Sequence, residues 1–341
     1  MEIAIAGCGA VASVYYAPAL TLLEREGAVR VSALFDPDRA ATSRIGASFP
    51  AARRVTTFEA LLDPAIDLEI VASPPRHHAT QAAQALRAGR AVLCEKPFAL
   101  STVDAEDVIA AASTSGAVLA VGMVRRLLPA TRTIRALLAS WALGSLERIE
   151  CFEGGPFRWP VQSPAYFDRS TAGGGVLLDI GTHVLDLLAW WLGPPTSLRY
   201  QDDAMGGVEA NCRVRLAWNH AEADVRLSRD WERPNRYLVT GSRGWLSWIA
   251  NEGHQLEMAL RGAEYVSKVC LHEPDGRPAR NFHQTFLEQI RQVVRAVRGD
   301  PAEIVTGADA LASVALVERC YRARTPLAMP WLTEAEQEAV A

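Results

Sequence analysis

The chain has 341 residues, of which 49% are hydrophobic and 22% are charged, and its formal net charge is −4. This length is enough for two domains, each with its own core. No basic block is present, which argues against a nucleic-acid-binding surface and favours a small or medium-sized soluble substrate. The six cysteines show neither Cys-x-x-Cys spacing nor a cluster with histidine. We therefore expect reduced thiols in a cytoplasmic protein and no metal site.

The N-terminal segment from Ile3 to Leu23 carries no charged side chain. Its length would suit a signal peptide or a membrane helix, but Glu2 is acidic, the first basic residue is Arg25 and Pro18 interrupts the run. A buried strand followed by a buried helix explains the segment better. We therefore predict no membrane segment.

Strands and helices alternate through the first third of the chain. Apolar, strand-like runs cover residues 2–6, 29–35, 68–72, 91–94 and 117–123. One helix between them covers about 78–88 and ends at Gly89; another starts at Ser101, where Asp104 completes a capping box, and stops at Gly116. This alternation predicts an α/β domain with a doubly wound parallel sheet over residues 1–122.

The pattern changes after residue 122. In the runs 208–218 and 221–227 every second residue is apolar, which predicts antiparallel strands with one solvated face. The polar positions expected on that face are Glu209, Arg213, Arg215, Glu222, Asp224 and Arg226. A turn at 241–244 joins two more strands, and helices return at 282–297 and 307–321. We therefore predict a second, α+β domain over residues 123–341 with a mostly antiparallel open sheet, whose helix near 307–321 packs back on the first domain.

The first strand is followed by the turn Gly7-x-Gly9-x-x-Ala12, which opens a helix. Gly7 permits the tight turn, Gly9 the close approach of the backbone to a pyrophosphate, and Ala12 the contact between helix and strand. The start of the helix at Ala10 and Val11 adds a partial positive charge. The motif predicts a dinucleotide-binding turn of the Rossmann type; a purely structural turn is the alternative.

Two later strand ends add candidate cofactor contacts. Asp36 ends the second strand, where a carboxylate can bind both ribose hydroxyls and repel a 2′-phosphate, so NAD is favoured and NADP is the alternative. Ser73 and Pro74 follow a further strand at the edge where ligands bind in such sheets. His78 is close enough in sequence to reach the cofactor or the substrate, or it simply starts the following helix.

Lysine is rare in this chain. Of the 35 basic residues only Lys96 and Lys268 are lysines, and a lysine retained here is expected to do what arginine cannot, since an ammonium can lose its proton. Lys96 follows a strand in the run Cys94-Glu95-Lys96-Pro97 and is placed to polarise or deprotonate a hydroxyl near a nicotinamide. Glu95 is its counter-ion or a cofactor contact, and Pro97 fixes the turn and is a candidate for a cis bond.

A third run extends from Gly173-Gly174-Gly175 to Trp191. On a helix, Asp179, His183 and Asp186 would share one face. A histidine supported by a carboxylate is suited to shuttle a proton near neutral pH, whereas a buried polar trio that fixes the helix is the alternative.

Together these motifs resemble the Gfo/Idh/MocA family of oxidoreductases. The resemblance covers the glycine turn, Ser73-Pro74-Pro75 with His78, Val92 to Pro97, Val121-Gly122 with Arg125-Arg126, and Gly173 to Trp191. It implies a Rossmann domain followed by an α+β domain, and a catalytic lysine at Lys96 with Asp179 and His183 completing the site. The division of proton transfer between Lys96 and His183 stays open.

The resemblance also implies an NAD(P)-dependent dehydrogenase or reductase for a sugar, cyclitol or nucleotide-linked sugar, assembled as a homodimer or homotetramer through the open sheet face. Substrate contacts are then expected from Lys96, Arg125, Asp179 and His183, and from the aromatic side chains Phe157, Trp159 and Tyr166. Val124 departs from the polar residue of many relatives. Two alternatives remain: an NAD-dependent glycosidase or epimerase-like enzyme with transient oxidation, and a non-catalytic sugar or nucleotide sensor.

Overall fold

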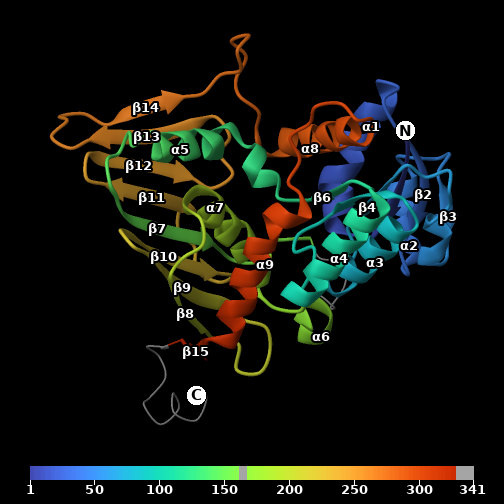
Figure 1. Ribbon diagram of the computed structural model, residues 1–341, viewed down its shortest axis with the longest axis horizontal. Helices are drawn as coiled ribbons and strands as arrows, with labels where there is room; N and C mark the ends of the chain where they lie inside the picture. Colours follow the sequence, from blue (N-terminus) through green and yellow to red (C-terminus); the bar gives the residue numbers. More distant parts are fainter. Residues whose placement is uncertain (161–166, 328–341) are drawn as a thin grey trace.

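In the computed structural model of the protein, residues 1–160 and 167–327 are described, and they form two domains side by side (Figure 1). The first is built on a parallel six-stranded sheet in the order β3-β2-β1-β4-β5-β6. Its elements are β1 (Glu2–Ala6), η1 (Ala12–Tyr16), α1 (Ala17–Arg25), β2 (Arg30–Phe35), α2 (Arg39–Gly46), β3 (Arg53–Val55), η2 (Phe58–Leu61), β4 (Leu68–Val71), α3 (Pro75–Arg87), β5 (Ala91–Cys94), α4 (Thr102–Ser115) and β6 (Leu119–Val121).

The second domain is built on a nine-stranded sheet in the order β14-β13-β12-β11-β7-β10-β9-β8-β15. The pairs β7–β10 and β8–β15 are parallel and the other pairs are antiparallel. Its strands are β7 (Leu146–Gly154), β8 (Ser197–Asp202), β9 (Asn211–Trp218), β10 (Ala221–Ser228), β11 (Arg236–Gly241), β12 (Gly244–Ile249), β13 (Gln255–Leu260), β14 (Ser267–Cys270) and β15 (Arg324–Pro326). The predicted fold class is confirmed in both domains.

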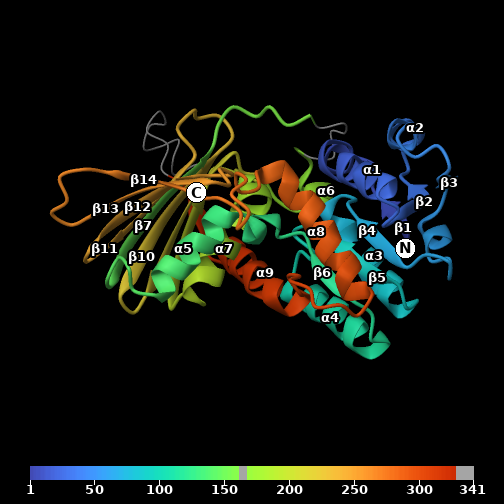
Figure 2. The ribbon, with the colours of Figure 1, turned by 90° about the horizontal axis from the view of Figure 1, so that it is seen from above.

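Helices cover one face of the large sheet. The helices packed on this face are α5 (Pro129–Ala139), η5 (Leu177–Gly181) and α7 (Thr182–Leu192). The other helical elements of this part of the chain are η3 (Val124–Leu127), α6 (Arg169–Ala172), α8 (Phe282–Val297) and α9 (Gly307–Arg322). Figure 2 shows α5 and α7 lying along this face, while the opposite face carries no helix within the described residues. The apolar residues of the strands meet those of α7 in a single core that includes Val214, Val225, Leu185 and Leu188.

The last two long helices join the domains. The apolar stripe of α8, with Phe286 and Ile290, packs into the core of the first sheet beside Ile3 and Ile5. α9 contributes Ala310 and Val314 to the first domain's core and Leu316 and Val317 to the second, and it lies between the two domains in Figure 1. Thr102 at the start of α4 donates to Glu318 of α9 at 2.8 Å. Both long helices, α8 and α9, therefore pack on the first domain.

Local signals in the sequence account for several element ends. Ser101 caps α4 by accepting a hydrogen bond from the Asp104 N–H, and Gly116 ends that helix with φ +70°.

The sequence does not predict the edge strand β3. It has only three residues, two of them arginines, so it shows no strand pattern.

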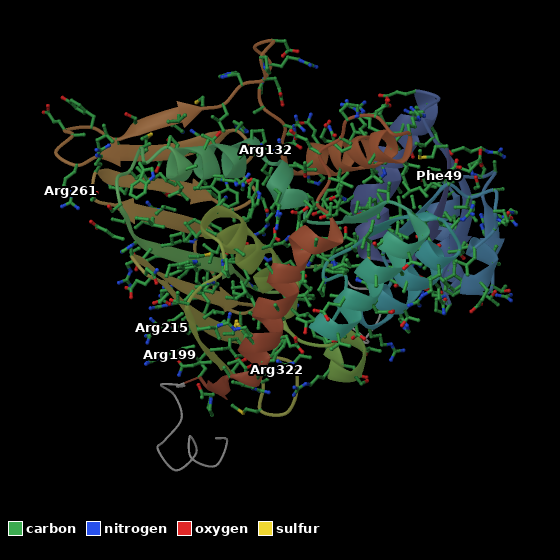
Figure 3. The ribbon with its side chains drawn as sticks, viewed as in Figure 1. Phe49, Arg132, Arg199, Arg215, Arg261 and Arg322 are labelled. Carbon is green, nitrogen blue, oxygen red and sulfur yellow. The ribbon has the colours of Figure 1, made fainter. Side chains whose placement is uncertain are left out.

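The prediction that Glu209 lies on the solvated face of the large sheet was wrong. Glu209 lies before β9 begins, is buried, and accepts hydrogen bonds from the backbone N–H groups of Gly175 (2.9 Å) and Leu177 (3.0 Å). The other predicted positions follow the alternation, and Arg199 and Arg215, paired across β8 and β9, point away from the sheet in Figure 3.

The run of residues 169–192 is long and apolar enough to cross a membrane by length and composition alone. However, 67% of its most apolar window is buried inside the protein, as expected for a core helix. α7 is the centre of the second domain's core, which explains why its residues are apolar on nearly every side.

A buried carboxyl group predicts how stability depends on pH. Glu69 lies on β4 between Ala4 of β1 and Val92 of β5, is 0% exposed, and neither of its carboxylate oxygens has a hydrogen-bond partner within the described residues. Burial raises the pKa of Glu69 to about 8. Because the folded state favours the protonated acid, its contribution to stability is complete below the ordinary glutamate pKa and is lost as pH rises through about 8.

We therefore expect Glu69→Gln to resist alkaline destabilisation. Between pH 6 and pH 9 the wild type should lose on the order of 2 kcal/mol of unfolding free energy relative to the variant, because glutamine has no charge to bury. Thermal unfolding of both proteins at the two pH values measures this difference. The same pH response in the wild type and the variant would show that the ionised Glu69 carboxylate is solvated or paired with a positive charge.

Candidate active site

The glycine turn after β1 is tight on one side and open on the other. Gly7 has φ +93°, and a Cβ there would lie 2.3 Å from the Ser73 backbone nitrogen, so only glycine fits. A Cβ at Gly9, in contrast, would meet no heavy atom within 4 Å. Ala12 is buried in the sheet's core, as its predicted packing role requires. The open space at Gly9 is where the backbone of such a turn approaches a pyrophosphate.

Asp36 follows β2 next to this turn. Its Oδ2 accepts a hydrogen bond from the Cys8 N–H (2.8 Å) and its Oδ1 accepts one from the Asp38 N–H (2.8 Å). The carboxylate is therefore fixed in place at the carboxyl edge of the sheet, with acceptor capacity left for hydroxyl groups. Burial, and to a lesser extent the charge of Asp36, raise the pKa of the neighbouring Cys8 thiol to about 12, so Cys8 stays protonated.

Lys96 extends from the end of β5 to the second domain. Its Nζ donates to Asp179 Oδ1 at 2.8 Å and to the Asp179 backbone oxygen at 2.9 Å, and the side chain is 14% exposed. The Lys96–Pro97 bond is cis, as the sequence suggested. The two contacts hold the ammonium group at the boundary between the domains.

Glu95 is not the counter-ion of Lys96 in this arrangement. It is buried, accepts hydrogen bonds from the Tyr16 hydroxyl (2.7 Å) and the Lys96 backbone N–H (3.0 Å), and burial raises its pKa. Gln289 of α8 in turn donates to the Tyr16 hydroxyl at 3.2 Å. Tyr16 and Gln289 were not predicted, because they lie far from Glu95 in sequence and each would pass for an ordinary helical residue.

His78 is held by backbone groups of two loops, and its contact with the cofactor or the substrate stays a prediction. It is buried on α3, with Nδ1 2.7 Å from the Pro97 backbone oxygen and Nε2 2.6 Å from the Ser73 backbone oxygen. Both ring nitrogens are therefore engaged by backbone. His78 ties the loop after β4, which contains Ser73 and Pro74, to the loop that carries Lys96. Ser73 itself donates from Oγ to Gln81 at 2.6 Å.

Asp179 lies on η5 and contacts two cations. Besides Lys96, it binds Arg229, whose Nη2 donates to Oδ2 at 3.0 Å. Asp179 thus accepts hydrogen bonds from the side chains of both Lys96 and Arg229. Support of His183 by Asp179 stays a prediction. The glycine triplet positions this segment: a Cβ at Gly175 would lie 2.1 Å from the Glu209 backbone oxygen, so only glycine permits the contact.

His183 is half-buried at the start of α7. Burial and the charges of Lys96 and Arg125 hold the pKa of His183 well below its ordinary value, so its imidazole is neutral at pH 7. Asp186, the third member of the predicted trio, is separate from it: the buried Asp186 carboxylate binds Arg126 through two hydrogen bonds of 2.9 and 2.7 Å.

Arg125, predicted to contact the substrate, is buried beneath this helix. Its guanidinium forms two hydrogen bonds to Glu153, of 2.7 and 2.8 Å, and the Tyr237 hydroxyl donates to the same carboxylate. Arg125 therefore supplies a fixed positive charge rather than a free hydrogen-bonding surface. Val124 is buried in the first domain's core, which explains why an apolar residue serves there.

Aromatic side chains connect the two domains beside the glycine turn. Trp159 stacks on Tyr15 of η1, with ring centroids 5.9 Å apart, and Tyr15 stacks on Phe286 of α8 at 4.3 Å. Phe157 lies under the Arg229 guanidinium at 4.8 Å. Figure 2 shows the segment after β7 passing across to the first domain, and Tyr166 lies outside the described residues.

Two family models match the chain. The model of the oxidoreductase family with NAD-binding Rossmann fold matches residues 1–123, and that of the GFO/IDH/MocA C-terminal domain matches residues 131–247. Together they cover more than half of the sequence, and the protein therefore belongs to the Gfo/Idh/MocA family of oxidoreductases. The resemblance inferred from the motifs is confirmed.

Individual relatives agree with this assignment. The 1,5-anhydro-D-fructose reductase of Ensifer adhaerens is 35% identical over 279 residues, which cover 77% of this chain and 79% of the relative. A 3-ketoreductase from Actinomadura kijaniata, in complex with NADP and TDP-benzene, superposes with a TM-score of 0.82 at 22% identity, covering 97% and 99% of the two chains. A levoglucosan dehydrogenase in complex with NADH and levoglucosan gives 0.82 at 17% identity, covering 95% and 96%. The structural matches establish the shared fold.

The open space at Gly9 yields a direct test of the turn's role. Gly9→Ala should fold and melt like the wild type, because the added methyl group meets no protein atom. It should nevertheless weaken NADH binding about tenfold or more, because that methyl occupies the space needed by the pyrophosphate. Fluorescence titration with NADH measures the effect, and unchanged affinity would show that the dinucleotide binds elsewhere.

Proposed function

We propose that the protein transfers a hydride between a nicotinamide dinucleotide and a secondary alcohol or ketone of a sugar, cyclitol or nucleotide-linked sugar. The observation that carries this proposal is the Lys96 ammonium, held by Asp179 at the carboxyl edge of an NAD-binding sheet. The names of the relatives, which include a sugar-derivative reductase and inositol 2-dehydrogenases, support this substrate class.

The residues present fit a dinucleotide. The open space at Gly9, the helix that begins at Ala10 and Val11, and the fixed carboxylate of Asp36 would hold its pyrophosphate and ribose. When bound, the nicotinamide supplies the carbon that accepts or donates the hydride. Ser73 and Pro74 would border the same edge of the sheet. Glu95 and His78 would instead fix the Lys96 loop from the side away from the dinucleotide.

Two side chains would divide the proton chemistry. In oxidation, the neutral imidazole of His183 accepts the proton of the substrate hydroxyl, while Lys96 donates a hydrogen bond to the same oxygen and stabilises the negative charge that develops there. In reduction, protonated His183 returns the proton to that oxygen. Burial and the charges of Lys96 and Arg125 hold the pKa of His183 well below its ordinary value, so its imidazole is neutral and has a lone pair that can accept the proton. Asp179 orients the ammonium, and Phe157 and Trp159 would border the sugar.

Assembly and location complete the proposal. The open face of the large sheet carries ion pairs such as Arg148–Glu222 (3.2 Å) and a partly buried pair between Arg213 and Asp224, which suits a polar interface between two or four copies of the chain. All six cysteines are free thiols, five of them buried, which is compatible with a reducing cytoplasm.

Replacement of Lys96 tests the proposed chemistry. Lys96→Ala should lower turnover by about a thousandfold, because both the positive charge at the substrate oxygen and its orientation are lost. NADH affinity should remain nearly unchanged. The other lysine provides a matched control: Lys268 is exposed on β14, and Lys268→Ala should keep full turnover. An active Lys96→Ala enzyme would refute the assignment.

Asp36 predicts the preferred dinucleotide. Its charge should make the wild type bind NAD at least about tenfold more tightly than NADP, since a carboxylate at this place repels a 2′-phosphate. Asp36→Asn should narrow the difference by removing that repulsion. Titration of both proteins with both dinucleotides measures the ratio. Tighter binding of NADP by the wild type would contradict the proposal.

A further inference from the structure

Arg229 lies directly after β10 and shares the Asp179 carboxylate with Lys96. Arg229 Nη2 donates to Oδ2 at 3.0 Å, while Lys96 Nζ donates to Oδ1 at 2.8 Å. The Arg229 side chain is 11% exposed and that of Asp179 is 37% exposed. One carboxylate therefore connects two cations, of which one comes from the first domain and the other from the large sheet.

The position of Arg229 is fixed by its surroundings. Its backbone N–H donates to the Ala210 oxygen at 2.9 Å, and its backbone oxygen accepts a hydrogen bond from the Phe157 N–H at 2.9 Å. The guanidinium lies over the Phe157 ring at 4.8 Å. Because this group is already oriented, it loses little conformational freedom when it holds one oxygen of Asp179.

A carboxylate that is shared by two cations holds each of them less strongly than it would hold one alone, because part of its charge is already neutralised. We propose that Arg229 is a positioning residue that limits the hold of Asp179 on Lys96 and so keeps the ammonium available to the substrate oxygen. This inference rests on the proposed function, in which Lys96 polarises that oxygen. Without Arg229, the Asp179 carboxylate is less neutralised, holds the ammonium more strongly and withdraws it from the substrate.

The scarcity of lysine permits a test that does not depend on activity. Lys96 and Lys268 are the only lysines, so acetic anhydride labelling followed by peptide mass spectrometry gives the ratio of their acylation rates, with exposed Lys268 as the internal standard. In Arg229→Met the acylation rate of Lys96 relative to that of Lys268 should fall severalfold, because the Asp179 carboxylate holds the Lys96 ammonium more tightly once the charge of Arg229 is removed. Arg229→Lys, which keeps the charge, should restore most of the wild-type ratio.

A neighbouring arginine serves as the matched control. Arg233 lies on the same loop, and its guanidinium faces the rings of Phe152 (5.8 Å) and Trp231 (5.7 Å). Arg233→Met should leave the labelling ratio unchanged. An unchanged or increased ratio in Arg229→Met would overturn the proposal, as would a wild-type Lys96 that does not react at all.

A double-mutant cycle tests whether Arg229 acts through Asp179. With a substrate of the wild type, Arg229→Met should lower kcat by about tenfold to a hundredfold at unchanged NADH affinity and melting temperature, as expected when a reacting group is misplaced. In an Asp179→Asn background the same substitution should cause no further loss. Independent, multiplying losses would overturn the proposal. A wild type without turnover on any carbohydrate would remove the proposed function, while the labelling ratio would still decide the role of Arg229.

Discussion

The contact between the Lys96 ammonium and Asp179 is the interaction on which the site depends. It joins the end of β5, in the parallel sheet, to η5, in the second domain, and Arg229 at the end of β10 fixes its other side. The Lys96 ammonium comes from the parallel sheet and the Asp179 carboxylate that binds it comes from the second domain, so their contact requires both domains. The chemistry of the protein therefore depends on how the two domains are held together.

Apolar packing supplies that attachment. α9 belongs to both cores, and α8 lies on the first sheet although the chain reaches it only after strands β7 to β14 of the second domain. Buried ion pairs, such as Arg126 with Asp186 on α7, help to fix how the elements are oriented but add little net stability, because the desolvation of both groups offsets their attraction. The polar contacts of the site are thus short-range details within a geometry that hydrophobic burial sets.

The sequence predicted features that have local causes. The parallel sheet followed from apolar strands alternating with helices, and the glycine turn from two glycines in the required context. The rarity of lysine singled out Lys96, whose catalytic role stays a prediction. The partners of those residues were not predictable. Lys96 and Asp179 are 83 residues apart, and Arg229 and Asp179 are 50 apart, so no local pattern connects them. Glu209 was misplaced because alternation shows the faces of a strand but not the residue at which the strand begins.

A crystal structure of the protein with bound NADH would test the central claim most directly. We expect the nicotinamide ring to lie next to Lys96 Nζ, with the pyrophosphate against Gly9 and with the contacts of Asp179 to Lys96 and Arg229 retained. A dinucleotide bound away from the glycine turn, or a Lys96 side chain turned away from the nicotinamide, would contradict it.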